Sequence, residues 1–228
     1  MKQPSASLRD ALVVVLGLTT GAVNAVTFLR LGNVFSSVLT GNLVLLGVAA
    51  GQRHASLALH GGLALVGFSV GVLAGSAMAG AAHDEQPAWP HRTTLTLAIE
   101  LVILAGFSGG WLATGGLPSG GARMALLGVA SAAMGLQSAA VRRLGQMSST
   151  YLTSTLAGIL QALAFRRWPP DWARSTGVIV ALVAGAVLGA VAAESLAALV
   201  PVAVLVPVAV VVTCSLWPGA RHEQPDGG

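Results

Sequence analysis

Long apolar segments separated by short polar linkers are the feature that most constrains how this chain folds. A helix that crosses a lipid bilayer needs about 20 predominantly apolar residues. Only 9% of the residues are charged, whereas soluble domains carry about 25%, so too few charges are present to cover a water-exposed surface. The sequence therefore predicts an all-α, polytopic helical membrane protein that has the lipid bilayer as its partner. The candidate segments are 11–29, 34–50, 57–82, 95–114, 123–141, 148–165, 176–199 and 200–217.

Two of these segments are doubtful as complete membrane crossings. Segments 34–50 and 148–165 are short and contain several Ser, Thr, Gly and Asn residues. Each is compatible with a tilted helix, a broken helix or a re-entrant segment that is buried in protein or faces water. We therefore expect six to eight transmembrane segments in a single membrane domain over residues 1–228, with a polar tail at 218–228.

The basic residues are scattered between the apolar segments and form no basic stripe, so we expect no nucleic-acid partner. They act instead as topology signals. With eight crossings and the N-terminus inside, 8 basic residues lie inside and 4 outside; with six crossings the numbers are 9 and 3. Both arrangements predict a multi-pass protein of the cell inner (plasma) membrane with cytoplasmic N- and C-termini, and the difference does not choose between them.

The two halves of the chain resemble each other. Residues 31–43 read LGNVFSSVLTGNL, and residues 144–156 read LGQMSSTYLTSTL. At a spacing of 114 residues, Gly135 follows Gly21, and the series Ala181, Gly185 and Gly189 follows Gly67, Gly71 and Gly75. We therefore predict homologous halves at about 11–114 and 123–217. Four crossings in each half would make them parallel, and three crossings would invert one half relative to the other.

Two longer blocks resemble a known family. The chain reads GAVNAVTFLRLGNVF at 21–35 and LTGNLVLLG at 39–47, and it reads MGLQSAAVRR at 134–143 before Leu152 and Thr153. These blocks, in order and spacing, resemble the YoaK / DUF1275 family of bacterial membrane proteins over nearly the whole chain. The resemblance implies membrane location and fold more than activity, because the family is uncharacterised. Asn24 departs from it, since the family often has an acidic residue there, and so does Thr153-Ser154, where Thr-Gly is usual.

Uncharged polar residues inside the apolar segments are the candidates for substrate binding, because polar groups are retained in a membrane where they face protein or water. The first is Thr40-Gly41-Asn42, which could bind a polar solute at a helix break. The alternative to solute binding is a structural hydrogen bond between packed helices. Asn24 and Gln137 precede the two repeated motifs and would line one cavity if the halves face each other. Thr153 and Thr155 are the repeat equivalents of Thr40 and Asn42.

Glu100 and Glu194 are the acids within the predicted crossings, and a proton-coupled transporter needs a group that titrates in each cycle. Both lie near segment ends, so an interfacial position is the alternative. The five His residues have no spacing that favours a metal site, and the sequence has no nucleophile elbow and no paired-Cys motif. We therefore expect no metal, no cofactor and no catalytic residues.

Duplicated halves with polar motifs in apolar segments favour a secondary transporter or exporter of an unidentified small-molecule substrate. Two alternatives stay open. One is a membrane-embedded enzyme that acts on a lipophilic substrate, which would need an acid–base pair around Glu100 or Glu194. The other is a non-catalytic partner of another membrane protein, with small-residue helix faces that bind other chains. Such faces could also pack against a second copy of the chain, so a homo-oligomer is a further possibility.

Overall fold

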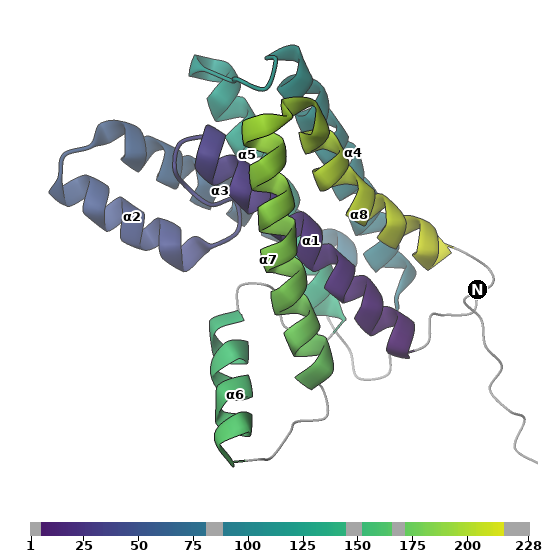
Figure 1. Cartoon of the computed structure of the whole chain (residues 1–228). Helices are drawn as coiled ribbons and strands as arrows, with labels where there is room; N and C mark the ends of the chain where they lie inside the picture. The colour runs from purple at the N-terminus through teal and green to yellow at the C-terminus, as the bar shows by residue number, and fades with distance from the viewer. Residues whose placement is uncertain (1–5, 81–88, 145–151, 166–171, 217–228) are drawn as a thin grey trace, which may run out of the picture.

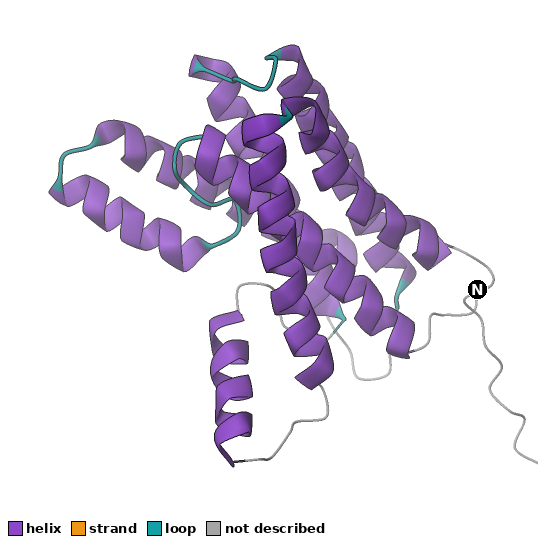
Figure 2. Ribbon diagram, viewed as in Figure 1, coloured by secondary structure: helices purple, strands orange, loops and turns teal. Residues whose placement is uncertain are grey.

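The computed structural model describes residues 6–80, 89–144, 152–165 and 172–216, without the side chains of 6–7 and 152–155. All regular structure in these residues is helical, as Figures 1 and 2 show, which confirms the all-α prediction. The helices are α1 (Ala6–Arg30), α2 (Leu39–Gly51), α3 (Ala55–Ala79), α4 (His91–Ala113), α5 (Gly120–Arg143), α6 (Leu152–Phe165), α7 (Trp172–Ser195), the short 3₁₀ helix η2 (Ala197–Leu199) and α8 (Val200–Leu216).

Six of the described helices are long and apolar enough to cross a membrane, namely α1, α3, α4, α5, α7 and η2–α8. The other two, α2 and α6, have 13 and 14 residues. At a rise of 1.5 Å per residue each is about 20 Å long, whereas the hydrocarbon core of a bilayer is about 30 Å thick. The two short helices lie in the doubtful segments 34–50 and 148–165, apart from Gly51 at the end of α2. The described residues therefore support six crossings, the lower of the predicted numbers.

The helices α1 and α5 form the centre of the bundle. In their apolar windows 67% and 72% of the residues are buried, against 22% to 39% in the other four long helices. The outer helices instead expose apolar side chains such as Val66 and Leu73 on α3 and Val180 and Val187 on α7. In a membrane, lipid covers such faces at no cost. The uncharged polar side chains described on α1 and α5 are consequently held inside protein, namely Thr19, Thr20, Asn24, Thr27, Ser131, Gln137 and Ser138.

Small residues bring the central helices into close contact with α7 and α3. A methyl group on Gly21 would overlap the carbonyl oxygen of Leu182 on α7, and a methyl group on Gly135 would overlap that of Phe68 on α3. Small residues at such positions allow helix backbones to approach closely. Along both pairs, residues with higher numbers on one helix contact residues with higher numbers on the other. The helices α1 and α7 therefore run parallel, and so do α3 and α5.

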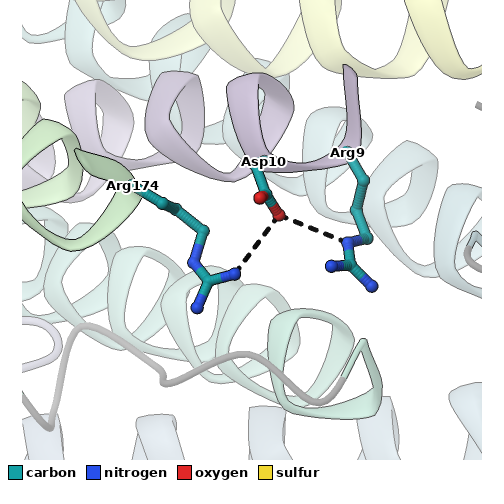
Figure 3. A network of polar contacts seen from close by, with 3 residues as sticks. All are labelled: Arg9, Asp10 and Arg174. Atoms are coloured by element: carbon teal, nitrogen blue, oxygen red, sulfur yellow. Dashed lines mark hydrogen bonds and ion pairs between the residues drawn. The ribbon is translucent and has the colours of Figure 1, made fainter. Parts of the chain in front are cut away.

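The N-terminal ends of α1 and α7 lie together at one end of the bundle. There the Asp10 carboxylate is 3.3 Å from Arg9 and 3.4 Å from Arg174 of α7 (Figure 3). Val13 of α1 and Val141, near the C-terminal end of α5, line the same small cavity. The end of α5 thus lies with the beginning of α1, so these two central helices run antiparallel.

The helices α4 and α8 pack on α5 and α1, respectively, and also against each other. Thr94 Oγ1 donates to Ser215 Oγ at 3.1 Å, and Trp111 Nε1 donates to the backbone oxygen of Ala197 at 2.8 Å. These bonds join the beginning of α4 to the end of α8, and the end of α4 to the turn before α8. The two helices are therefore antiparallel and fixed at both ends. The helix α2 forms a hairpin with α3 that projects from the bundle (Figure 1).

Candidate functional site

The chain leaves α1 through a sharp turn. Gly32 and Asn33 have φ angles of 123° and 59°, and left-handed backbone of this kind is adopted at least cost by glycine. Gly32 also lies over the imidazole of His60, so that a side chain at this position would overlap the ring. Residues 31–38 are consequently non-helical, and segment 34–50 is helical only from Leu39 onward.

Asn24, on α1, holds this non-helical segment through both the oxygen and the nitrogen of its side-chain amide. Its Oδ1 accepts hydrogen bonds from Ser36 Oγ and Ser37 N, both at 3.1 Å. Its Nδ2 donates to the backbone oxygen of Thr20 at 2.9 Å and to Ser37 Oγ at 2.7 Å. An asparagine amide offers two donors and two acceptor sites, so all four are used. The segment 31–38 is thereby held against the middle of α1.

Asn42 holds the same segment from the side of α2. The backbone N–H of Phe35 donates to Asn42 Oδ1 at 3.0 Å, and Asn42 Nδ2 donates to the Phe35 carbonyl oxygen at 2.6 Å. Asn42 is fully buried, while Thr40 is exposed and Gly41 is half-buried within α2. The predicted motif Thr40-Gly41-Asn42 therefore contributes one buried polar side chain, and its amide is bonded to protein backbone.

Gln137, on α5, reaches across to α1. Its Nε2 donates to the backbone oxygen of Leu16 at 3.0 Å and contacts Thr20 Oγ1 at 3.3 Å. Its Oε1 is buried and has no hydrogen-bond partner among the described residues. Because Thr20 also accepts a bond from Asn24, the structure brings Asn24 and Gln137, which the sequence placed in separate motifs, to the two sides of one threonine.

A small cavity of about 30 Å³ lies at this crossing of α1 and α5. Thr20, Ser37, Gln137 and Ser138 supply its polar lining, and Val13, Leu16, Met134, Val141 and Val178 are among its apolar lining. A volume of this size holds a water molecule when two to four polar partners are present. The arrangement can therefore bind a small hydrogen-bond donor against Gln137 Oε1 in the interior of the bundle.

The two predicted acids differ in position. Glu100 lies near the middle of α4, because that helix begins at His91 rather than at 95, and it is fully buried. Neither of its carboxyl oxygens has a hydrogen-bond partner among the described residues. Glu194 is exposed at the C-terminal end of α7. Of the two, Glu100 is thus the one inside protein, away from a helix end.

Two predicted site residues cannot be placed with the others. Thr153 and Thr155 belong to the first turns of α6, and their side chains lie outside the described part of the chain. The structure adds Thr20, Ser37 and Ser138, which the sequence interpretation did not select. Ser37 belongs to the repeated motif at 31–43, which could have pointed to it. Thr20 precedes Asn24 by four residues, so helical spacing could have pointed to Thr20.

Comparison with known proteins identifies relatives of this chain. Residues 12–216 match the model of a family described as a protein of unknown function, DUF1275. The chain is 37% identical over 164 residues to a Bacillus subtilis protein described as UPF0700 transmembrane protein YoaK, an alignment that covers 71% of this chain and 70% of that protein. No solved structure matches.

Proposed function

Since the chain belongs to the DUF1275 family of transmembrane proteins, whose function is unknown, we propose that it is a secondary transporter of a small polar solute. The observation that carries the proposal is the cavity between α1 and α5, which is lined in part by Gln137, whose buried Oε1 has no partner among the described residues. An unmade hydrogen bond of this kind costs about 1–3 kcal/mol. We propose that a transported solute makes this hydrogen bond.

The number of crossings and one pair of corresponding contacts support an inverted repeat, which we propose as the architecture of this transporter. Three of the six candidate crossings precede residue 114 and three follow it, and an odd number of crossings in each half inverts the second half. The contacts of Gly21 with Leu182 and of Gly135 with Phe68 correspond at a spacing of 114 residues. We infer that the halves are homologous and inverted, an architecture in which the solute lies between repeats beside interrupted helices. The break at 31–38 is such an interruption.

The charges support cytoplasmic termini. The end of the bundle where α1 begins and α8 ends carries Arg9, Arg92, Arg142, Arg143 and Arg174, and the opposite end carries Arg30, Arg53 and Arg123. That is five against three in the described chain. Because basic residues are enriched on the cytoplasmic side, we place the first end there, in the cell inner membrane.

Within the cavity we assign solute contact to Gln137, assisted by Thr20 and Ser37, and we assign to Asn24 the holding of Ser37 in the cavity wall. Asn42 positions the segment 31–38 through Phe35 and so keeps Ser37 in the cavity wall. A cavity of about 30 Å³ admits little more than water, so a larger solute would need it to widen. Release of the segment 31–38 from Asn24 is the movement that would admit a larger solute.

We assign proton coupling to Glu100. A carboxyl group buried without a partner is costly when charged, so its charge can change only when water or a counter-charge reaches it. Such a requirement ties protonation to an opening of the bundle. The substitution Glu100→Gln keeps the size of the side chain but removes its titratable group, and we expect it to preserve solute exchange but to abolish acceleration by a pH gradient.

The test is efflux from liposomes that contain purified protein and an extract of polar metabolites. We expect at least one solute to leave wild-type liposomes about tenfold faster than Gln137→Leu liposomes, which corresponds to about 1.4 kcal/mol in the barrier. Gln161→Leu, at an exposed position on α6, is the matched control and should behave as wild type. If no solute leaves wild-type liposomes faster than protein-free liposomes, the proposed function is wrong.

A further inference from the structure

A second and larger cavity lies between α3 and α5, near their C-terminal ends. Its volume is about 800 Å³, within the range of about 300–1,000 Å³ typical of sites for small organic ligands. Phe68, Val72 and Leu73 form an apolar wall, and Ser76 and Ser138 add hydroxyl groups. The groove thus offers apolar surface to the body of a ligand and a few donors to its polar part.

One end of this groove is strongly basic. Arg142 and Arg143 of α5 line it, and Arg92 reaches the same place from the beginning of α4. A Cβ atom on Gly80 would stand 3.0 Å from Nη1 of Arg143 and 3.4 Å from Nη1 of Arg92. Guanidinium groups from two helices therefore converge on the end of α3. Guanidinium groups are the side chains best suited to binding oxyanions.

We propose that this groove is a binding site for an amphipathic anion. A carboxylate or phosphate group lies at Arg92, Arg142 and Arg143, where guanidinium forks match the geometry of such oxyanions. The apolar body lies along Phe68 and Leu73. The chemistry fits an anionic phospholipid, for which basic pockets between membrane helices are known sites, and also a soluble organic anion. The site stands without the proposed transport function.

Helix capping is the structural alternative for these arginines. At the end of α7, Arg30 Nη2 donates to the backbone oxygen of Ala193 at 2.9 Å, and cations near a helix C-terminus are stabilising. A capping arginine changes the stability of the protein whether or not an anion is present. A ligand-binding arginine changes the stability that the anion adds. The two roles are therefore separated by one titration.

Thermal unfolding of the purified protein in uncharged detergent, titrated with decyl phosphate, measures this added stability. We expect decyl phosphate to bind at least tenfold more tightly than decanol or inorganic phosphate, and Arg142→Gln/Arg143→Gln to lower its affinity at least tenfold. The control Arg123→Gln, at the other end of α5, should bind as wild type. Equal affinities for decyl phosphate in the double variant and the control would overturn the proposal and leave capping as the role.

Leu73→Trp gives a second test that leaves the arginines intact. Leu73 is 71% exposed, so the protein should fold with the groove partly filled, and decyl phosphate should bind at least tenfold more weakly while inorganic phosphate is unaffected. Unchanged decyl phosphate binding would overturn the assignment of the apolar wall. Native mass spectrometry then distinguishes an anionic phospholipid from a soluble organic anion as the natural ligand. A phospholipid retained by wild type and lost from Arg142→Gln/Arg143→Gln identifies lipid, and decyl phosphate binding without retained lipid identifies a soluble anion.

Discussion

Thr20 and Gln137 meet at the crossing of the two central helices, where Gln137 Nε2 lies 3.3 Å from Thr20 Oγ1. The same hydroxyl is 3.1 Å from the backbone oxygen of Leu16, and the backbone oxygen of Thr20 accepts a bond from Asn24. One threonine thereby joins the polar side chains of α1 and α5. The neighbouring Thr19 is also fully buried, but its hydroxyl has no partner among the described residues.

These adjacent threonines give a matched pair of substitutions. Thr20→Val removes a hydroxyl that takes part in two hydrogen bonds, so the free energy of unfolding should fall by about 1 kcal/mol. Thr19→Val removes a hydroxyl without a described partner and should leave stability unchanged or raise it. Unfolding of both variants in mixed detergent micelles measures the difference. An equal loss in both would mean that the contact between Thr20 and Gln137 contributes nothing.

Asn42→Leu should destabilise the protein by about 2 kcal/mol, because it leaves the N–H and the carbonyl of Phe35 without their partner. The control Thr40→Val, at an exposed position of α2, should have little effect. The same unfolding measurement checks both. If Asn42→Leu retains full stability but loses transport, then Asn42 binds the solute directly, as its sequence motif first indicated, and does not act by positioning the segment 31–38.

Gly21→Ala and Gly135→Ala should each destabilise the protein by about 1–3 kcal/mol, the usual cost of overpacking, because the added methyl groups would overlap the carbonyl oxygens of Leu182 and Phe68. Gly47→Ala is the control, since no atom lies within 4 Å of an added methyl group there. Similar losses at positions 21 and 135 are expected from homologous halves. A loss at only one of them would argue against equivalent packing.

The sequence was sufficient to predict the class of fold, because apolar length and the scarcity of charge are properties of single segments. The segments that contain α2 and α6 were identified as doubtful crossings, because they are short and rich in Ser, Thr, Gly and Asn, but their form was left open between a tilted helix, a broken helix and a re-entrant segment. The sequence did not predict the central position of Glu100 in its helix. The apolar segment begins at 95, whereas the helix begins at His91. Polar Thr93 and Thr94 continue that helix because they are buried against protein.

The candidate site was predicted in part. Asn24 and Gln137 were selected as polar residues in apolar helices, and the structure adds that both bond to Thr20. Helical spacing places Thr20 beside Asn24, but the contact of Thr20 with Gln137 joins positions 117 residues apart and was beyond prediction. The bond from Asn42 to the Phe35 backbone was also beyond prediction, since it depends on the turn at Gly32.

The membrane arrangement predicts which residues can be labelled from each side. Arg53, in the turn between α2 and α3, and Arg142, at the end of α5, lie at opposite ends of the bundle. With Cys214 replaced by Ser, Arg53→Cys should react with an impermeant thiol reagent from outside the cell, and Arg142→Cys only after the membrane is opened. Labelling of Arg142→Cys from outside would contradict six crossings with a cytoplasmic N-terminus.

The most direct test of the central claim, a solute path between α1 and α5, is the reactivity of Ser138→Cys in the same Cys214→Ser background. Ser138 is 9% exposed and lines both the central cavity and the groove. An impermeant thiol reagent should modify this cysteine in right-side-out and in inside-out vesicles, because a transporter opens its centre to each side in turn. Modification from one side only, or from neither side while Arg53→Cys and Arg142→Cys react, would contradict the account.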